Sequence, residues 1–269
     1  MNIFIVGTPR SGTTLLQQEV YKGFDSLSIP ESHFFSKMKT KNPFKPLFYS
    51  KKSYVNEFIN LLNKNLKLNI ELSRSKLLTS QGAQRVFFEL LEEVKKARGK
   101  NLFIEKTPMH LHFIEQIKSV DENAMFIHIV RKPFENLRSF YKASNEKPEH
   151  WNGGRNIDEL IERYAFDINI HKKYINKKNH FFVDYDYFVA HKEHVLDGLC
   201  QFLTKPIVTR KIDLKDIIDE SETWKHNNFN EVGLRNNQGE VKGFLSEQLF
   251  MQKYKELNEE YIKLLAMIY

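Results

Sequence analysis

Residues 2–14 read Asn-Ile-Phe-Ile-Val-Gly-Thr-Pro-Arg-Ser-Gly-Thr-Thr, the stretch from which the fold can be worked out. Residues 2–6 form a short, mostly apolar run that ends at Gly7, which predicts a buried strand because there is no room for a helix. Residues 13–22 carry apolar side chains at helical spacing. A strand, a glycine loop and a helix in this order can cradle phosphate, because the first N–H groups of the helix point at the anion. We expect this strand to lie at the centre of a sheet.

The rest of the chain alternates between expected strands and helices. Further strands are expected at residues 102–105, 124–130 and 180–184. Pro108 and Pro133 follow the first two of these strands, near the first position of a helix. Further helices are expected at residues 157–175 and 187–202. The alternation predicts an α/β fold with three layers, in which helices cover both faces of a central parallel sheet.

Two segments interrupt the alternation. Residues 42–78 are rich in Lys and Asn and carry apolar side chains at helical spacing, and a firmer helix is expected at residues 81–97. We interpret about residues 37–98 as a helical insertion that shapes a cleft, within a single domain of residues 1–269. Residues 224–244 are polar and contain three glycines, which indicates an ordered loop or a lid before a final helix at residues 246–267.

Composition restricts the environment and the partners of the protein. The chain of 269 residues has 41 Lys and Arg against 34 Asp and Glu, and a positive surface attracts anions of many kinds. The single cysteine, Cys200, excludes an intramolecular disulfide and fits a reducing compartment. No signal peptide is recognisable, and no run approaches the roughly 20 apolar residues that a membrane span needs. We therefore expect a cytoplasmic protein without a membrane span.

The glycine loop has the spacing of a Walker A loop but lacks its lysine. Thr13 occupies the position of the lysine that reaches the β and γ phosphates in ATPases and GTPases. A cation stands earlier instead, at Arg10, where a guanidinium can hold phosphate or sulfate oxygens beside the N–H groups of residues 11–14. Apart from Asp184, no acidic residue ends an apolar strand as a Walker B aspartate would. A metal-dependent NTPase is therefore disfavoured.

The loop Gly-Thr-Pro-Arg-Ser-Gly-Thr-Thr resembles the 5′-phosphosulfate loop of sulfotransferases that use 3′-phosphoadenosine 5′-phosphosulfate (PAPS). The resemblance extends over most of residues 1–190. It implies a P-loop-like fold, PAPS as donor, 3′-phosphoadenosine 5′-phosphate (PAP) as product, and no required metal. It also implies that the donor is bound by Thr8, Pro9, Arg10, Ser11, Gly12, Thr13 and Thr14.

A second segment, residues 127–139, is similar to the family's 3′-phosphate site. Arg131 stands at the carboxyl end of an expected parallel strand, where open α/β sheets bind ligands. Ser139 follows eight residues later on the adjoining helix and adds a neutral hydrogen-bond donor. Together the two residues can select a 3′-phosphate.

The segment Pro-Glu-Ser-His-Phe-Phe at residues 30–35 provides a candidate general base. Its aromatic surroundings can raise the pKa of Glu31 toward that of a useful base. The segment resembles the E-x-H-F-F stretch of glycan sulfotransferases of the heparan-modifying type, in which the glutamate is the base. Glu31 also lies 21 residues after Arg10, similar to the spacing in tyrosylprotein sulfotransferases. We interpret His33 as a positioning or core residue.

The segment Ile-Glu-Lys-Thr-Pro at residues 104–108 resembles the E-K-T-P stretch of the same glycan enzymes. That resemblance implies that Lys106 assists departure of the phosphate, by neutralising charge on the bridging oxygen as the S–O bond breaks. Steroid- and phenol-type sulfotransferases have K-T-H here, with the histidine as base, and Pro108 departs from that pattern. His110 and His112 remain alternative bases.

The remaining motifs leave the acceptor open. Residues 182–186 look like a structural strand segment of the family, and Arg235 is a candidate nucleotide contact in the polar tail. The two glycan-type matches favour a sugar hydroxyl, while a lipid, a peptide tyrosine or a small metabolite stays possible, as does an amine acceptor. Residues 37–80 and 145–155 are the expected acceptor walls.

Two other functional classes compete with sulfuryl transfer. A P-loop kinase or NTPase is the alternative enzyme, and the missing Walker lysine argues against it. A nucleic-acid-binding protein would need a concentrated basic stripe, whereas the lysines here are dispersed. We therefore expect no nucleic-acid partner, and the oligomeric state is left open.

Overall fold

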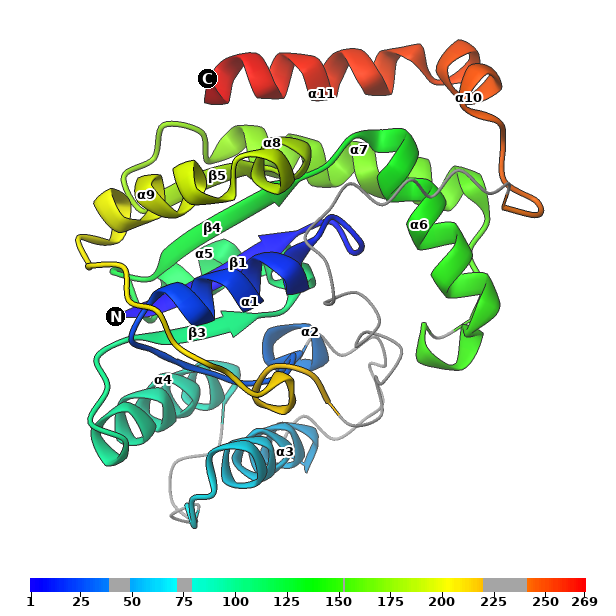
Figure 1. Ribbon diagram of the computed structural model, residues 1–269. Helices are drawn as coiled ribbons and strands as arrows, with labels where there is room; N and C mark the ends of the chain where they lie inside the picture. The colour runs from blue at the N-terminus through cyan, green and yellow to red at the C-terminus, as the bar shows by residue number, and fades with distance from the viewer. Residues whose placement is uncertain (39–48, 72–78, 152, 220–240) are drawn as a thin grey trace.

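The computed structural model describes residues 1–38, 49–71, 79–151, 153–219 and 241–269. Within these ranges five parallel strands form one sheet with the order β2-β3-β1-β4-β5 (Figure 1). The strands are β1 (Asn2–Gly7), β2 (Leu27–Ser28), β3 (Phe103–Lys106), β4 (Met125–Val130) and β5 (His180–Asp184). The prediction that β1 is the central strand is confirmed. Its carboxyl end therefore lies between those of β3 and β4, and the ends of these three strands form the base of the candidate site.

The sheet is buried on both faces because apolar side chains alternate along its strands. On β1, Phe4 and Val6 join one hydrophobic cluster, whereas Ile3 and Ile5 join the cluster on the opposite face. All four side chains are fully buried. A parallel sheet with two buried faces needs helices on both sides, which confirms the predicted α/β layering.

One face is covered by α1 (Thr13–Gly23), α8 (Tyr185–Ala190) and α9 (Lys192–Leu203). The opposite face is covered by α2 (Phe34–Met38), α3 (Tyr49–Leu66), α4 (Ser80–Ala97), the 3₁₀ helix η1 (Pro108–Phe113) and α5 (Ile114–Lys118). Phe87 on α4 lies at the centre of this second layer, with ring centroids 4.5 Å from Phe58 and 4.6 Å from Phe34. The helices α3 and α4 thus pack directly against the segment that follows β2.

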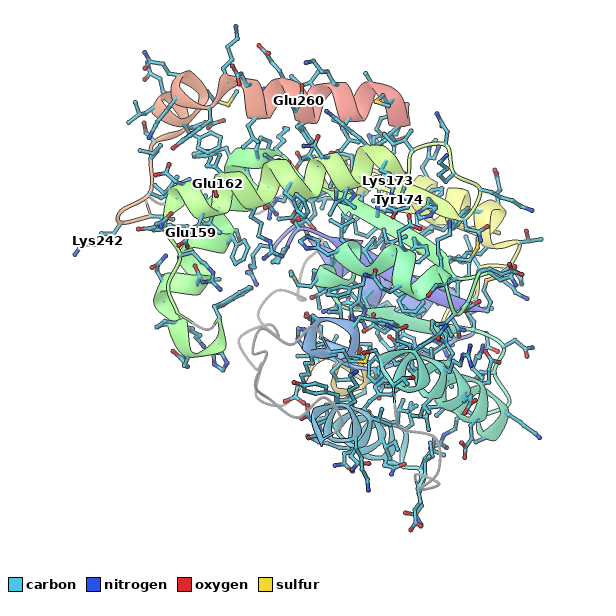
Figure 2. All side chains as sticks on the ribbon, turned by 180° about the vertical axis from the view of Figure 1, so that it is seen from behind. Glu159, Glu162, Lys173, Tyr174, Lys242 and Glu260 are labelled. Atoms are coloured by element: carbon cyan, nitrogen blue, oxygen red, sulfur yellow. The ribbon has the colours of Figure 1, made fainter. Side chains whose placement is uncertain are left out.

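A third cluster joins α6 (Pro133–Glu146) and α7 (Ile157–Lys173) to the C-terminal helices α10 (Glu247–Lys253) and α11 (Lys255–Ile268). Figure 2 shows Glu159 and Glu162 near the start of α7 and Lys173 at its far end, an arrangement that complements the helix dipole. Asn156 caps α7 by accepting a hydrogen bond from the N–H of Glu159 at 2.8 Å. Lys172 pairs with Glu260, so α11 is held along α7. Two further 3₁₀ turns are η2 (Pro148–His150) and η3 (Leu214–Asp216).

The boundaries of several elements differ from the prediction. The two residues of β2 are too few to show any periodicity, so this strand was missed. The helix expected at residues 187–202 is two helices separated at His191, and it begins earlier because Asp184 caps α8 by accepting from the N–H of Tyr187 at 2.8 Å. The final helix is also divided, at Tyr254, whose hydroxyl donates to Asp158 on α7 at 3.0 Å.

The expected lid at residues 224–244 lies almost entirely outside the described residues. Its last part is described: Gly243 has a φ of 83°, and Phe244 packs on Phe134 and Phe250. Among the described helices, none combines the length and apolar character needed to cross a membrane.

Candidate active site

The loop between β1 and α1 has a conformation suited to anions. Arg10 and Gly12 have positive φ values of 71° and 102°, and the N–H of Ser11 donates back to the carbonyl of Thr8 at 3.1 Å. Gly12 stands at the N-cap of α1 without a side-chain cap. The first N–H groups of a helix have no partner within the helix, and here they open onto the end of β1.

Steric contacts explain both glycines of the loop. A Cβ on Gly7 would lie 2.5 Å from the carbonyl oxygen of Ile129 on the neighbouring strand. A Cβ on Gly12 would lie 2.3 Å from Cδ2 of Tyr185, in addition to the strain of its positive φ. The loop can therefore approach β4 and α8 this closely only with glycine at both positions.

Three side chains hold the loop, one from the residue directly after β4 and two from α6. Arg131 donates from Nη1 to the carbonyl of Arg10 at 3.3 Å, and Asn136 donates from Nδ2 to the carbonyl of Pro9 at 3.2 Å. Arg10 in turn donates from Nε to Oγ of Ser139 at 3.3 Å. The two predicted parts of the donor site, the loop and the pair Arg131 and Ser139, are thus brought into direct contact.

Two tyrosines hold Arg131 in place, and one nitrogen of its guanidinium has no hydrogen-bond partner among the described residues. Its guanidinium lies 4.2 Å from the ring centroid of Tyr185, and its carbonyl accepts from the hydroxyl of Tyr164 at 2.5 Å. Its Nε is buried without a hydrogen-bond partner among the described residues, and the same holds for Oγ of Ser11 in the loop. Buried donors of this kind are normally satisfied. Both would be satisfied by phosphate or sulfate oxygens, so the residues present fit an anion of this kind.

The candidate base and the candidate leaving-group lysine are in direct contact. Lys106 is 1% exposed and places its Nζ 2.5 Å from Oε1 of Glu31 and 3.2 Å from Oγ1 of Thr14. The side chain of Glu31 is 13% exposed. The end of β3, the start of α1 and the segment after β2 therefore meet at one ammonium group.

The three nearby histidines differ in their surroundings. His33 Nε2 lies 3.4 Å from Oε2 of Glu31, with a side chain that is 42% exposed. His110 is fully buried, with Nδ1 2.8 Å from Glu105 and Nε2 accepting from the N–H of Phe35 at 3.4 Å. His112 lies 2.5 Å from Asp167 on α7. His33 is thus the histidine that reaches the candidate base.

The remaining predicted site residues are placed as follows. Thr8, Pro9 and Thr13 are buried within the loop. Arg235 lies outside the described residues. Sequence reasoning missed Asn136 and Tyr185, which support the loop and Arg131. Tyr185 belongs to residues 182–186, interpreted from the sequence as structural, and Asn136 has only its place in the first turn after Pro133 as a signal.

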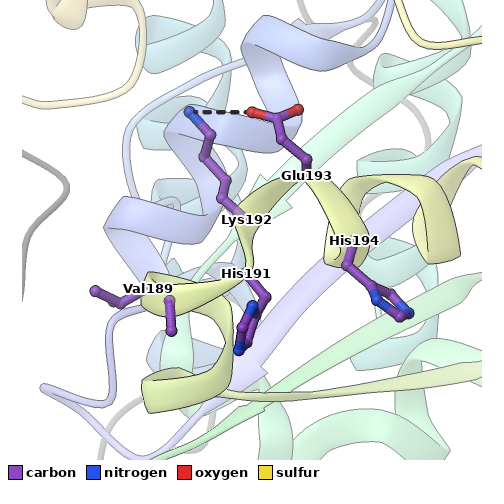
Figure 3. A pocket seen from close by; sticks show the side chains of 6 residues that line it. Val189, His191, Lys192, Glu193 and His194 are labelled. Atoms are coloured by element: carbon purple, nitrogen blue, oxygen red, sulfur yellow. Dashed lines mark ion pairs between the residues drawn. The ribbon is translucent and has the colours of Figure 1, made fainter.

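A surface pocket lies apart from these groups. It is lined by residues 189–194 at the junction of α8 and α9, where Lys192 pairs with Glu193 at 3.6 Å (Figure 3). None of its lining residues is a predicted site residue. In the part of the chain that the structure describes, no group of three or more His, Cys, Asp or Glu side chains is arranged to hold a metal ion.

A family profile described as "Sulfotransferase family" matches residues 2–208. No curated protein matches the sequence.

Three solved structures are similar across nearly the whole chain. A sulfotransferase domain from the curacin biosynthetic pathway shares 19% identity at a TM-score of 0.58, covering 94% of this chain and 96% of that one. A sulfotransferase domain from the Synechococcus PCC 7002 olefin synthase shares 16% identity at a TM-score of 0.61, covering 97% and 94%. A sulfotransferase from Alicyclobacillus acidocaldarius shares 14% identity at a TM-score of 0.54, covering 99% and 95%. At these identities the structures support the fold.

Proposed function

Because the chain belongs to the sulfotransferase family, we propose that it transfers a sulfuryl group from PAPS to the hydroxyl or amine of an acceptor. The observation that carries the proposal is the position of Lys106, whose ammonium contacts Thr14 of the anion-binding loop and Glu31 at once. A cation between an anion site and a carboxylate suits a reaction in which the carboxylate removes a proton from the attacking acceptor on one side and an anion leaves on the other.

The donor is proposed to lie along the carboxyl ends of β1, β3 and β4. The loop N–H groups, with the side chains of Arg10, Ser11, Thr13 and Thr14, bind the 5′-phosphosulfate. Arg131 and Ser139 bind the 3′-phosphate, and Arg235 is an additional nucleotide contact. The contact between Arg10 and Ser139 and the buried Nε of Arg131 support this assignment.

The chemical step is an in-line displacement at sulfur. Glu31 takes the proton of the acceptor hydroxyl, whose oxygen forms a new bond to sulfur. The bond between sulfur and the bridging oxygen breaks, its electron pair stays on that oxygen, and PAP departs. Lys106 and Arg10 stabilise the charge that develops there, since fixed cations are most effective where charge appears in the transition state. The transferring group carries fewer negative charges than a phosphoryl group, so these cations act without a required metal.

The acceptor is proposed to be a carbohydrate or a small metabolite, bound opposite the donor. Residues 37–80 and 145–155 form its walls, in a single domain whose residues 37–98 are a helical insertion. The packing of α3 and α4 against the segment that carries Glu31 supports this placement. The lone cysteine supports a cytoplasmic location.

Transfer of radioactive sulfur tests the function. Purified protein is incubated with [³⁵S]PAPS and a panel of glycosides, amino sugars and phenols, in EDTA. Formation of a sulfated acceptor in EDTA supports the proposal. Binding of PAP without transfer to any acceptor class, or to water, contradicts it.

A further inference from the structure

Two consecutive residues of β3 contact two consecutive residues of the segment after β2. Lys106 contacts Glu31, and Glu105 accepts hydrogen bonds from Ser32, at 2.7 Å from the hydroxyl and 3.4 Å from the N–H. Because side chains alternate along a strand, Glu105 and Lys106 point to opposite faces of the sheet. The contact between Lys106 and Glu31 on one face of the sheet is therefore accompanied by the contact between Glu105 and Ser32 on the other face.

Glu105 is fully buried, and both of its oxygens are used. Besides Ser32, Oε1 accepts from the hydroxyl of Thr107 at 2.6 Å, and Oε2 lies 2.8 Å from Nδ1 of His110. Nε2 of His110 accepts from the N–H of Phe35, so the ring carries its proton on Nδ1 and donates it to Glu105. The carboxylate thus ties together both ends of residues 32–35.

The charge of Glu105 is maintained by these donors. Burial disfavours the ionised form, but the contact with His110 and the hydrogen bonds from Thr107 and Ser32 outweigh it and hold the pKa of Glu105 below its ordinary value. An ionised carboxylate accepts only, which matches a set of three donor side chains. A neutral replacement would leave at least one of these donors facing another donor.

The network also holds a strained backbone. His33 has a φ of 52°, a left-handed conformation that costs about 1 kcal/mol for a residue other than glycine. Its N–H donates to Oγ1 of Thr107 at 3.2 Å, the same hydroxyl that donates to Glu105. Such conformations persist only where surrounding contacts enforce them.

We propose that Glu105 is a positioning residue, whose carboxylate fixes residues 31–35 so that Glu31 stays beside Lys106. The proposal rests on the proposed function, in which Glu31 is the general base. Glu105 itself is buried beneath the segment and acts through Ser32, Thr107 and His110.

The main test variant is Glu105→Gln, which preserves shape and removes the charge. It lowers the rate of sulfuryl transfer by about 10- to 100-fold, since a displacement of about 1 Å at a reacting group can cost 100-fold. The affinity for PAP stays within about threefold of wild type, because the donor loop is held separately by Arg131 and Asn136. Ser32→Ala removes one donor without changing charge and gives the same pattern, so the test does not depend on the folding of Glu105→Gln.

Glu19→Gln is the matched control. Glu19 on α1 is also a buried glutamate, but it pairs with Lys22 on the same helix and with Lys192 on α9. Its replacement leaves the transfer rate within about twofold of wild type while changing stability, as expected for a site that does not share partners with the catalytic pair.

The measurements are the single-turnover loss of ³⁵S from [³⁵S]PAPS to 4-nitrophenol and to water, the PAP affinity by calorimetry, and the pH profile of the transfer rate. A positioning role lowers the transfer rate at saturating PAPS while the PAP affinity is kept, and the wild-type pH profile fixes the pH at which the variants are compared. Unchanged rates in Glu105→Gln and Ser32→Ala overturn the proposal. A sulfuryl-transfer rate that falls by the same factor as the PAP affinity also overturns the proposal. Wild type that binds PAP but transfers sulfur neither to these two probes nor to any glycoside, amino sugar or phenol of the acceptor panel overturns the proposed function, and with it this role of Glu105.

Discussion

Nζ of Lys106 lies 2.5 Å from Oε1 of Glu31, joining the carboxyl end of β3 to the segment after β2. In this arrangement the carboxylate is held by a cation that is itself in contact with the anion-binding loop through Thr14. In the proposed function a bound donor and Glu31 share this ammonium group, and the two proposed roles, base and leaving-group cation, can be separated by mutation.

Glu31→Gln removes the proposed base and keeps its size. We expect the rate of sulfuryl transfer to fall by about 100-fold or more, as loss of a general base does. PAP affinity should equal that of wild type or exceed it, because Lys106 loses a competing partner. Single-turnover transfer measures the rate and calorimetry measures the PAP affinity, with Glu193→Gln on the surface as control. A transfer rate equal to wild type would assign the base to another group, first of all His33.

Arg131→Ala separates the two anionic ends of the donor. Loss of a charge-assisted hydrogen bond to phosphate should weaken PAP binding by about 10- to 100-fold. Adenosine 5′-phosphosulfate lacks the 3′-phosphate, so its binding should weaken less. The remaining loss comes from the missing hydrogen bond between Arg131 and the carbonyl of Arg10, which holds the loop. The ratio of the two losses is the readout, and Arg98→Ala on the far end of α4 is the control. Equal losses for both nucleotides would contradict the 3′-phosphate assignment.

Gly12→Ala tests the packing of the loop. Gly12 and Gly99 both have positive φ values, of 102° and 60°, but an added Cβ meets the ring of Tyr185 only at Gly12. Gly99→Ala should lower the free energy of unfolding by about 1 kcal/mol, the cost of the conformation alone. Gly12→Ala should lower it further and abolish PAP binding. Similar unfolding midpoints in urea for the two variants would show that the loop accommodates a side chain.

A buried group of three histidines predicts how stability depends on pH. His128 on β4 contacts His171 through Nδ1 at 3.0 Å and His180 through Nε2 at 2.8 Å. Burial lowers the pKa of His171 to about 4 and that of His180 to about 4, and burial together with both neighbours places the pKa of His128 well below its ordinary value. All three rings therefore remain neutral in the folded protein at neutral pH.

The unfolded chain binds protons near pH 6.5, before the folded protein does, so the stability present above pH 6.5 is lost as the pH falls toward 4. For His171 alone the loss is about 3 kcal/mol at pH 4. The free energy of unfolding, measured in urea between pH 7.5 and 4, should fall with pH over this range. His171→Gln should make this fall smaller, whereas His194→Gln on the surface should leave it unchanged. A free energy of unfolding that stays constant over this range would contradict neutral burial of the cluster.

The local sequence was sufficient to predict secondary structure where the pattern lies within one continuous segment. Residues 2–14 predicted the strand, the loop and the helix, since periodicity and two glycines suffice for that unit. The parallel strands ending at Lys106 and Val130 were also predicted, because each is an apolar run followed by a proline. Their carboxyl ends lie at one edge of the sheet, and the resemblance to sulfotransferases implied roles for Lys106 and Arg131 in one site.

Contacts between segments that are distant in the sequence could not be predicted from local sequence patterns. The pairing of Glu105 with Ser32, and the grouping of His128 with His171 and His180, depend on how segments pack after folding. A glutamate within an apolar strand signals burial with partners but does not identify them. Tyr185 likewise supports Arg131 through a contact between α8 and the end of β4, which the sequence of neither segment reveals.

The proposed site binds a 3′-phosphorylated nucleotide without metal, and calorimetric titration of the wild-type protein measures that preference. We expect wild-type protein in EDTA to bind PAP at least about tenfold more tightly than it binds ATP in magnesium, a difference of about 1.4 kcal/mol or more. Tighter binding of magnesium ATP, or PAP binding that requires magnesium, would contradict the account and favour a nucleotide-phosphate enzyme on the same fold.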